Sequence, residues 1–288
     1  MNPAAPDWLV PDWPAPPGVH ALCTTRAGGI SQAPYDSLNL GSHVGDAPAA
    51  VRANRLVLQA ALHDVTPHAR AVFLNQTHGN GVVVLDGRLP ADGNEADACV
   101  TAAPGAVCTI MVADCLPVLL AHKSAQVVAA AHAGWRGLAG AQGGQGVLEA
   151  VFKRFCLQVQ SLSSLIAIKS EANDGPAWMA QDTLAWLGPC IGPHAFEVGQ
   201  DVRAAFCDAH AAAQSCFVPL AHAPGKYLCD LAGLARLRLQ ALGITQVYGN
   251  DSTPGWCTVA NASRFFSHRR DSAALGSSGR FAACVWRG

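Results

Sequence analysis

The 288-residue chain is predicted to fold as a single mixed α/β domain. Short runs rich in Val, Leu and Ala, typical of buried strands, are interleaved with segments of helical periodicity. The order of these segments does not follow a strict strand–helix–strand rhythm, which favours a mixed sheet over a doubly wound parallel sheet. Because no internal repeat and no convincing linker divides the chain, one domain is expected.

The composition excludes several classes of protein. Half of the residues are hydrophobic, 14% are charged, and the formal net charge is −1 without a dense Lys/Arg run, so nucleic acid and anionic membranes are not expected as main partners. The first residues lack the positive start and apolar run of a signal peptide, and no stretch reaches the ~18 apolar residues of a membrane span. Eleven cysteines without a CxxC pair are interpreted as reduced thiols. A cytoplasmic protein is therefore expected.

The N-terminal part contains three predicted segments. Residues 1–17 are Pro-rich and are predicted to form an extended arm. Residues 28–46 contain too much Gly, Ser and Pro for a helix and are predicted to be a turn-rich polar segment. Apolar residues at helical spacing then predict a helix over 46–63, with Asp46 as its N-cap.

The strands that follow place one potential metal ligand, His78, on a connection between strands and two others, Cys115 and His132, at strand ends. Two β-rich runs, 71–76 and 81–86, flank His78, and the apolar segment 106–122 is predicted to be two strands broken at residues 114–117. The other predicted elements are a strand over 126–134 ending near His132, a helix over 138–155, a surface insertion over 157–181, a strand over 183–189, a turn-dense loop over 188–199, helices over 198–208 and 231–242, and a last strand over 281–286.

Three short motifs carry the chemistry: NQTHGNG around His78, ADCLP around Cys115, and HAGWRG beginning at His132. Each places one borderline or soft ligand beside Gly or Pro. Two imidazoles and one thiolate could hold zinc and leave a fourth position open, as catalytic zinc sites do. The spacing of the three residues matches no compact zinc module, so a purely structural role for them also stays open at this point.

Arginines beside Gly-rich turns are candidate anion-binding residues. Arg136 in HAGWRG can pair with a phosphate or carboxylate, or form an internal ion pair with Asp114, while Trp135 can form the wall of a pocket. Arg26 in TTRAGG, and Arg269 with Arg270 in SHRRD, can bind phosphate or lie on the surface.

Two polar residues are further candidates for substrate binding, and three common cofactor or catalytic motifs are absent. Ser37 and Asn39 in PYDSLNL can bind a sugar or cap a turn. GxGxxG, GxSxG and GxxxxGK[ST] are absent from the chain, so Rossmann cofactors, α/β-hydrolase chemistry and P-loop ATP use have no sequence support.

The ordered series of motifs resembles the YfiH family, also called the laccase-domain or polyphenol-oxidase-like family. The series, which covers about Gly18 to Arg280, is TTRAGGIS, PYDSLNLGSHVGD, NQTHG, ADACV, ADCLPVLL, HAGWRG, GPCIGPHAFEVG, YLCDL and RFFSHRRD…SGR. The resemblance implies a catalytic domain over residues 18–288, folded as an α/β sandwich similar to a toxin-type cysteine-hydrolase-like domain. It also implies that His78, Cys115 and His132 are the metal ligands.

The resemblance implies purine nucleoside phosphorylase activity on adenosine, inosine, guanosine and methylthioadenosine, together with adenosine deaminase activity and a link to copper-dependent phenol oxidation. The expected cofactor is zinc, with copper as the alternative, and the expected partners are a nucleoside and phosphate. Asp114 is the candidate proton shuttle. The chain departs from the family at three positions: His268 stands where Tyr is usual, Ser278 where Thr is usual, and His194 where Cys is common.

Two other functions remain open from the residues alone. A copper oxidase is disfavoured because none of the 11 histidines forms the His-x-His pairs that multicopper clusters use. A metal-free hydrolase with Cys115 as nucleophile and His132 as base is chemically consistent with the same residues.

Overall fold

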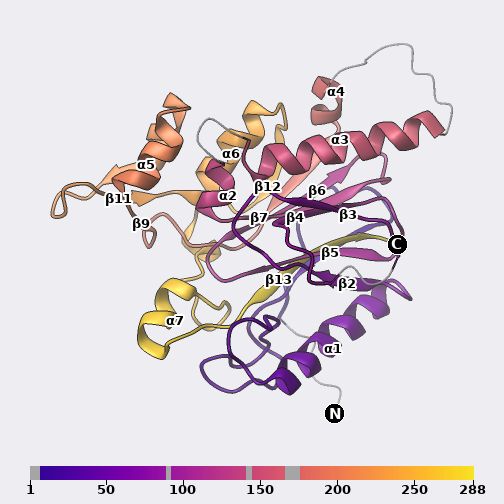
Figure 1. Cartoon of the computed structure of the whole chain (residues 1–288), viewed down its shortest axis with the longest axis horizontal. Helices are drawn as coiled ribbons and strands as arrows, with labels where there is room; N and C mark the ends of the chain where they lie inside the picture. Colours follow the sequence, from indigo (N-terminus) through magenta and orange to yellow (C-terminus); the bar gives the residue numbers. More distant parts are fainter. Residues whose placement is uncertain (1–6, 89–91, 141–144, 166–175) are drawn as a thin grey trace.

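The computed structural model describes residues 7–88, 92–140, 145–165 and 176–288 (Figure 1). Two β-sheets stack face to face, and helices cover their outer faces (Figure 1). The four-stranded sheet has the order β1 (Val19–Cys23), β13 (Phe281–Arg287), β5 (Ala106–Val112), β2 (Arg70–Phe73). The six-stranded sheet has the order β12 (Gln246–Gly249), β8 (Thr183–Leu187), β6 (Leu116–His122), β7 (Val128–Ala133), β4 (Ala98–Thr101), β3 (Val82–Leu85).

Both sheets are mixed. The pairs β2–β5, β3–β4 and β12–β8 are parallel, and the other pairs in the two sheets are antiparallel. A small antiparallel sheet is formed by β10 (Phe217–Pro219), β11 (Lys226–Cys229) and β9 (Glu197–Gly199). The prediction of a mixed α/β sandwich is confirmed.

Seven α-helices are assigned within the described residues. They are α1 (Pro48–Val65), α2 (Trp135–Ala139), α3 (Val147–Leu165), α4 (Pro176–Gln181), α5 (Gln200–Cys207), α6 (Leu231–Ala241) and α7 (His268–Leu275). Helix α1 covers the outer face of the four-stranded sheet, and α3 lies across the outer face of the six-stranded sheet (Figure 1). Among the described residues, no helix combines the length and apolar character needed to cross a membrane.

Strand residues alternate between the two faces of each sheet, as a period of two requires. On β5, Cys108, Ile110 and Val112 point into the core between the sheets, whereas Val107 and Met111 point towards α1. Both faces of this strand are apolar because both are covered. The same double covering explains why the sequence reads as continuous hydrophobic runs.

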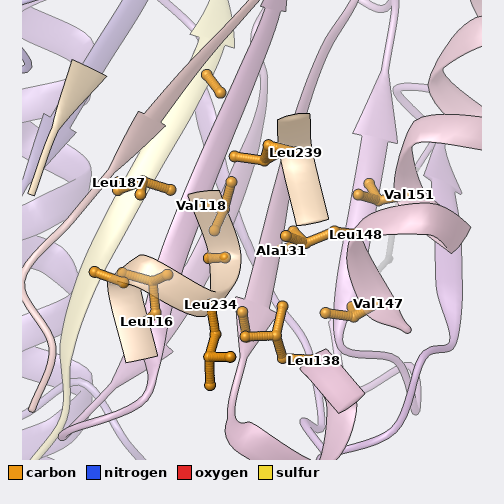
Figure 2. Close-up of a cluster of buried hydrophobic side chains, with 14 of the residues drawn as sticks. Leu116, Val118, Ala131, Leu138, Val147, Leu148, Val151, Leu187, Leu234 and Leu239 are labelled. Carbon is orange, nitrogen blue, oxygen red and sulfur yellow. The ribbon is translucent and has the colours of Figure 1, made fainter. Parts of the chain in front are cut away.

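A second core lies between the six-stranded sheet and its helices. Figure 2 shows Leu116, Val118 and Ala131 of the sheet facing a layer of helical side chains, which includes Val147 and Val151 of α3. Leu234 and Leu239 of α6 belong to the same cluster (Figure 2). Fully burying a Leu or Val side chain contributes roughly 1.5–3 kcal/mol, so this layer anchors α3 and α6 firmly to the sheet.

The predicted bounds of two helices differ from the structure. Helix α1 begins at Pro48 with Ala47 as N-cap, because the Asp46 carboxylate accepts hydrogen bonds from Ser31 Oγ (2.6 Å) and Asn39 Nδ2 (2.9 Å) instead. The helix predicted over 138–155 is two helices, since α2 ends at Gly140, where φ is +77°.

The segment 157–181 does not begin as a separate unit, because α3 continues without interruption from 147 to 165 and buries Val159. Its other end is α4, which buries Met179 and Ala180. Residues 166–175 lie outside the described residues. The described part of the N-terminal arm contacts the body of the protein through Leu9, whose N–H and C=O both pair with Cys23 at 2.8 Å.

Candidate functional site

Chain crossings between the two sheets bring the three ligands together. His78 lies on the connection from β2 to β3, and Cys115 lies on the connection from β5 to β6; both connections pass from the four-stranded to the six-stranded sheet. His132 lies near the end of β7. The predictions that His78 lies on a connection between strands and that Cys115 and His132 lie at strand ends are confirmed.

The ligand atoms of the trio converge on one point. One ring nitrogen each from His78 and His132 and the sulfur of Cys115 all lie within 4.8 Å of one another. The Cys115 Sγ is 3.7 Å from His78 Nε2, and the two imidazole rings are 4.8 Å apart at 76°. Since zinc and copper bind such donors at about 2.0–2.3 Å, a small contraction around a cation completes the site, and the donor set fits a metal ion.

A buried carboxylate, Asp97, orients two of the ligands. Asp97 is fully buried; its Oδ1 lies 2.8 Å from His132 Nδ1 and accepts the backbone N–H of His78 at 2.9 Å. Its Oδ2 accepts the N–H of Gly79 at 2.7 Å and the hydroxyl of Thr77 at 3.0 Å. Because Nδ1 of His132 donates to this carboxylate, its Nε2 is left free to bind a metal.

Burial by itself would raise the pKa of Asp97, but hydrogen bonds from His132, Gly79 and Thr77 outweigh burial and hold the pKa below its usual value. The sequence analysis missed this residue. Asp97 is the charged residue of the otherwise apolar ADACV segment, and a charge inside a buried run is a signal for such a role.

The backbone at the site is held in uncommon conformations. His78 has φ +61° and Asp114 has φ +92°, values that non-glycine residues rarely adopt and that cost of order 1–3 kcal/mol each. Gln76 ties the His78 connection to β5, because its amide both donates to the carbonyl of Met111 (2.7 Å) and accepts the N–H of Met111 (2.9 Å). The surrounding hydrogen bonds thus maintain the strained turn that carries a ligand.

The two glycines of HAGWRG are required by close approach. A Cβ on Gly134 would lie 3.0 Å from both Cys115 Sγ and His78 Cδ2, and a Cβ on Gly137 would lie 2.6 Å from the carbonyl oxygen of Gly79. Gly134 therefore leaves the space that the ligand side chains occupy. Gly137 lets α2 pack against the turn that carries His78.

The charges of Cys115 and His132 stabilise each other. Burial raises the pKa of the Cys115 thiol, but the positive charge of His132 and hydrogen bonds from His132 and His78 outweigh burial and bring this pKa to about 6. Burial lowers the pKa of His132, whereas the Cys115 thiolate and the hydrogen bond to Asp97 raise it to about 9. In the absence of a cation, the pair is therefore a thiolate beside an imidazolium at neutral pH.

The trio opens into a cavity of about 320 Å³. Its apolar and aromatic lining residues include Trp135, Ile191, Phe196 and Leu231. The other lining residues include His43, Gln76, Met111, Asp114, His268, Arg269 and Arg280. A larger cavity of about 680 Å³ beside α6 contains none of the trio, and its lining includes Arg238 and Glu149, which form an ion pair (2.9 Å).

Asp114 lies in the cavity wall with both carboxylate oxygens engaged. Oδ1 accepts the hydroxyl of Thr258 at 2.5 Å, and Oδ2 accepts the backbone N–H of Arg269 at 2.6 Å. It therefore joins the connection that carries Cys115 to the start of α7. The alternative of an Arg136–Asp114 ion pair is wrong, since Arg136 is exposed and stacks over Trp135 at 4.5 Å.

Four residues predicted to bind substrate do not line this cavity. Arg26 pairs with Asp36 (3.2 Å) and borders a separate shallow hollow, and Arg136 points to solvent. Ser37 accepts the N–H of Gly29 at 3.1 Å. Asn39 is fully buried; its Oδ1 accepts the N–H of Gly41 (3.0 Å) and the N–H of Arg280 (2.8 Å).

The cavity contains two cationic or potentially cationic residues that the sequence analysis did not single out, His43 and Arg280. His43 belongs to the turn-rich segment 28–46, and Arg280 belongs to the SGR sequence in the series that carries the family resemblance. Of the three positions where the chain departs from the family, His268 lines the cavity, His194 is exposed outside it, and Ser278 donates to Asp271 at 3.0 Å.

Comparison with known proteins shows the family to which the chain belongs. Residues 20–288 match the family model described as multi-copper polyphenol oxidoreductase laccase. The chain belongs to the YfiH family. It is 48% identical to the purine nucleoside phosphorylase of Pseudomonas aeruginosa over 97% of this chain and 98% of that protein. It is 44% identical to the purine nucleoside phosphorylase YfiH of Escherichia coli over 96% and 98%.

Solved structures of the YfiH family share the fold. The Neisseria meningitidis protein NMB0706 superposes with a TM-score of 0.76 at 41% identity, covering 97% of this chain and 98% of that one. YfiH of Bacillus licheniformis superposes with a TM-score of 0.72 at 28% identity, covering 94% and 93%. The likeness to a toxin-type hydrolase domain stays a prediction.

Proposed function

We propose that this protein is a zinc-dependent purine nucleoside phosphorylase that acts on adenosine, inosine, guanosine and methylthioadenosine and also deaminates adenosine. The observation that carries the proposal is the convergence of His78, Cys115 and His132 in the lining of a cavity of nucleoside size. The relatives from Pseudomonas aeruginosa and Escherichia coli, both named purine nucleoside phosphorylase, support the reaction class.

The lining of the cavity suits a nucleoside. Trp135 and Phe196 are aromatic lining residues against which a purine can pack, and Ile191 and Leu231 add apolar surface. The polar lining residues, which include His43, Gln76 and the arginines, suit the ribose and an anion. Small-molecule sites commonly combine an apolar wall with a few convergent polar groups in this way.

His78, Cys115 and His132 would hold the zinc ion, with Asp97 fixing the orientation of His132. When bound, zinc would supply Lewis acidity at this end of the cavity. To hold the ion, His132 would give up the proton that it carries beside the Cys115 thiolate, so metal binding at neutral pH should release one proton. Asp114 holds the Cys115 connection against α7, so a proton-shuttling role for it would require one of its two hydrogen bonds to open.

The test is a product assay on purified, metal-analysed protein. With phosphate present, adenosine should give adenine and ribose 1-phosphate. Part of the adenosine should also be deaminated to inosine, whether or not phosphate is present. Exhaustive chelation and the Cys115→Ala and His78→Ala variants should each abolish turnover. Saturating zinc occupancy without free base or inosine from any of the four nucleosides would overturn the proposal.

A metal-free cysteine hydrolase is the second candidate, favoured by the pKa of about 6 at Cys115 beside His132. Chelation would leave such an enzyme active, whereas alkylation would inactivate it. A copper polyphenol oxidase would instead require bound copper and oxidation of a phenol coupled to oxygen consumption; copper is the alternative metal for the same donors. A cytoplasmic location is part of the proposal and is supported by the eleven cysteines, all of which are free thiols.

A further inference from the structure

Two arginines in the cavity wall have no carboxylate partner among the residues that the structure describes. Arg280 Nη1 donates only to backbone carbonyls, those of Ser278 (2.8 Å) and Gly279 (3.0 Å). Arg269 likewise donates to the carbonyls of Ala195 (3.4 Å) and Glu197 (3.1 Å). An arginine that lines a cavity and has no carboxylate within ion-pair distance is able to bind an anionic ligand there.

Arginines outside the cavity have two kinds of partner. Some are paired with carboxylates, as Arg238 is with Glu149 at 2.9 Å. Others are half-buried and donate to backbone carbonyls without an ion pair among the described residues, namely Arg55, Arg236 and Arg287. What distinguishes the half-buried Arg280 and the exposed Arg269 is that both line the cavity that contains His78, Cys115 and His132.

The fold holds Arg280 in a specific place. Its backbone N–H donates to Oδ1 of the fully buried Asn39, and a Cβ on Gly41 would lie 2.8 Å from Arg280 Cγ. Asn39 and Gly41 therefore fix the backbone of Arg280 and leave room for its side chain. This accounts for the PYDSLNLG segment, whose polar residues do not themselves reach the cavity.

The surroundings of Arg280 and His43 favour a multiply charged anion. Burial lowers the pKa of His43, and the positive charges of Arg280, Arg55, His78 and His132 lower it further. Burial also lowers the pKa of Arg280, while Cys115 and Asp114 raise it, which places this guanidinium in electrostatic reach of the metal-ligand end. An arginine stays protonated under such conditions, so the cavity carries fixed positive charge.

We propose that Arg280, assisted by Arg269 and His43, forms the phosphate subsite of the cavity. The proposal rests on the proposed function, which needs a phosphate oxygen aligned with C1′ of the ribose. In that step an oxygen of hydrogenphosphate bonds to C1′ as the bond from C1′ to the purine nitrogen breaks. The bonding pair leaves with the purine, and the proton given up by hydrogenphosphate ends on the purine. Arg280 and Arg269 hold and orient the dianion.

The test is direct binding of inorganic phosphate, measured by calorimetry on metal-free and zinc-loaded protein. Phosphate should bind the wild type with a stoichiometry of one, and Arg280→Gln should raise the dissociation constant ~10-fold or more, as expected for loss of a charged hydrogen bond. Arg280→Lys, which keeps the charge and loses the planar fork, should give an intermediate value. Arg154→Gln removes an exposed positive charge on α3 and is the matched control.

Steady-state kinetics gives the second readout. Arg280→Gln and Arg269→Gln should raise KM for phosphate while changing KM for the nucleoside by less than ~2-fold. An unchanged phosphate affinity in both variants would overturn the subsite. If Arg280→Gln fails to fold by circular dichroism, Arg280→Lys and Arg269→Gln carry the same test.

The outcomes separate the subsite from the reaction. Arginine-dependent phosphate binding without phosphorolysis in the wild type would keep the subsite and reject the proposed function. Phosphorolysis with the same rate and the same KM for phosphate in both arginine variants would reject the subsite and keep the proposed function. An Arg280-dependent affinity for a nucleoside monophosphate, with no affinity for free phosphate, would assign the arginine to a phosphate monoester and overturn the subsite as stated.

Discussion

The carboxylate of Asp97 lies 2.8 Å from Nδ1 of His132 and, through the same oxygen, accepts the backbone N–H of His78 at 2.9 Å. One buried side chain therefore orients the ring of one ligand and the backbone of another. Because these ligands come from β7 and from the connection between β2 and β3, Asp97 couples two distant parts of the chain at the site.

Asp97→Asn should weaken metal binding ~10- to 100-fold, the usual cost of losing a carboxylate behind a histidine ligand. Asn retains the shape but removes the charge that fixes the tautomer of His132. Competition with a chromophoric zinc chelator measures the change. Asp182→Asn, which alters an exposed pair with Lys123, is the control. Equal zinc affinity in wild type and Asp97→Asn would show that His132 does not depend on this carboxylate.

Gly134→Ala should disturb the ligands while leaving the fold intact. The added methyl would lie 3.0 Å from Cys115 Sγ and His78 Cδ2, so one of these side chains must shift away from the shared point. We expect zinc affinity and turnover to fall together, with an unchanged circular dichroism spectrum. Gly255→Ala, whose Cβ would meet nothing within 4 Å, is the matched control. Wild-type zinc affinity in Gly134→Ala would contradict the crowding argument.

In metal-free protein, Cys115 should react with iodoacetamide far faster than any other cysteine at pH 7. Its thiol titrates with a pKa of about 6, so the thiolate disappears as the pH falls through 6, whereas His132 keeps its proton until the pH rises through about 9. The alkylation rate should therefore reach its plateau above about pH 7.

The other thiols provide an internal control for that experiment. Burial raises the pKa of the partly exposed Cys207 thiol. It raises the pKa of Cys156 and of Cys216 to about 11. All three residues should therefore react slowly at neutral pH. Peptide mass spectrometry identifies the labelled position. Zinc should protect Cys115 from labelling. A rate that still climbs between pH 8 and 9 would show an unperturbed thiol at this position.

Asp271→Asn should destabilise the protein by ~2–4 kcal/mol at pH 7, the range for removing one partner of a mostly buried ion pair. Asp271 accepts from Arg270 (2.7 Å), Ser278 (3.0 Å) and the N–H of Ser267 (3.2 Å), and so joins α7 to the segment that carries Arg280. Burial would raise its pKa, but these hydrogen bonds and the charge of Arg270 lower it.

The pH dependence of that effect has a definite sign. A carboxyl whose folded pKa lies below its unfolded value stabilises the protein fully above the unfolded value near 4 and loses this effect as the pH falls through the lower folded value. The difference between wild type and Asp271→Asn, measured by urea unfolding, should thus shrink below about pH 4. A difference that stays constant from pH 7 to pH 3 would assign the stabilisation to packing instead of charge.

Local sequence determined much of this protein. Apolar runs predicted β5, β6, β7, β8 and β13 within a few residues, because strands covered on both faces must be apolar throughout. The motifs around His78, Cys115 and His132 predicted the three residues whose ligand atoms converge, since a potential metal-binding side chain next to Gly or Pro is visible in the chain itself.

Only the tertiary structure decided which polar residues reach the cavity. Arg26 and Arg136 lie in Gly-rich contexts similar to those of real anion-binding residues, yet one pairs with Asp36 and the other faces solvent. Arg280 has no such Gly-rich signal that distinguishes it, and the charge of Asp97 inside an apolar run does not name its partners. The contacts of both residues come from positions far away in sequence: Asn39 contacts Arg280, and His78 and His132 contact Asp97. Local patterns report which face of a strand is buried, whereas the partner of a side chain depends on how distant connections cross between the two sheets.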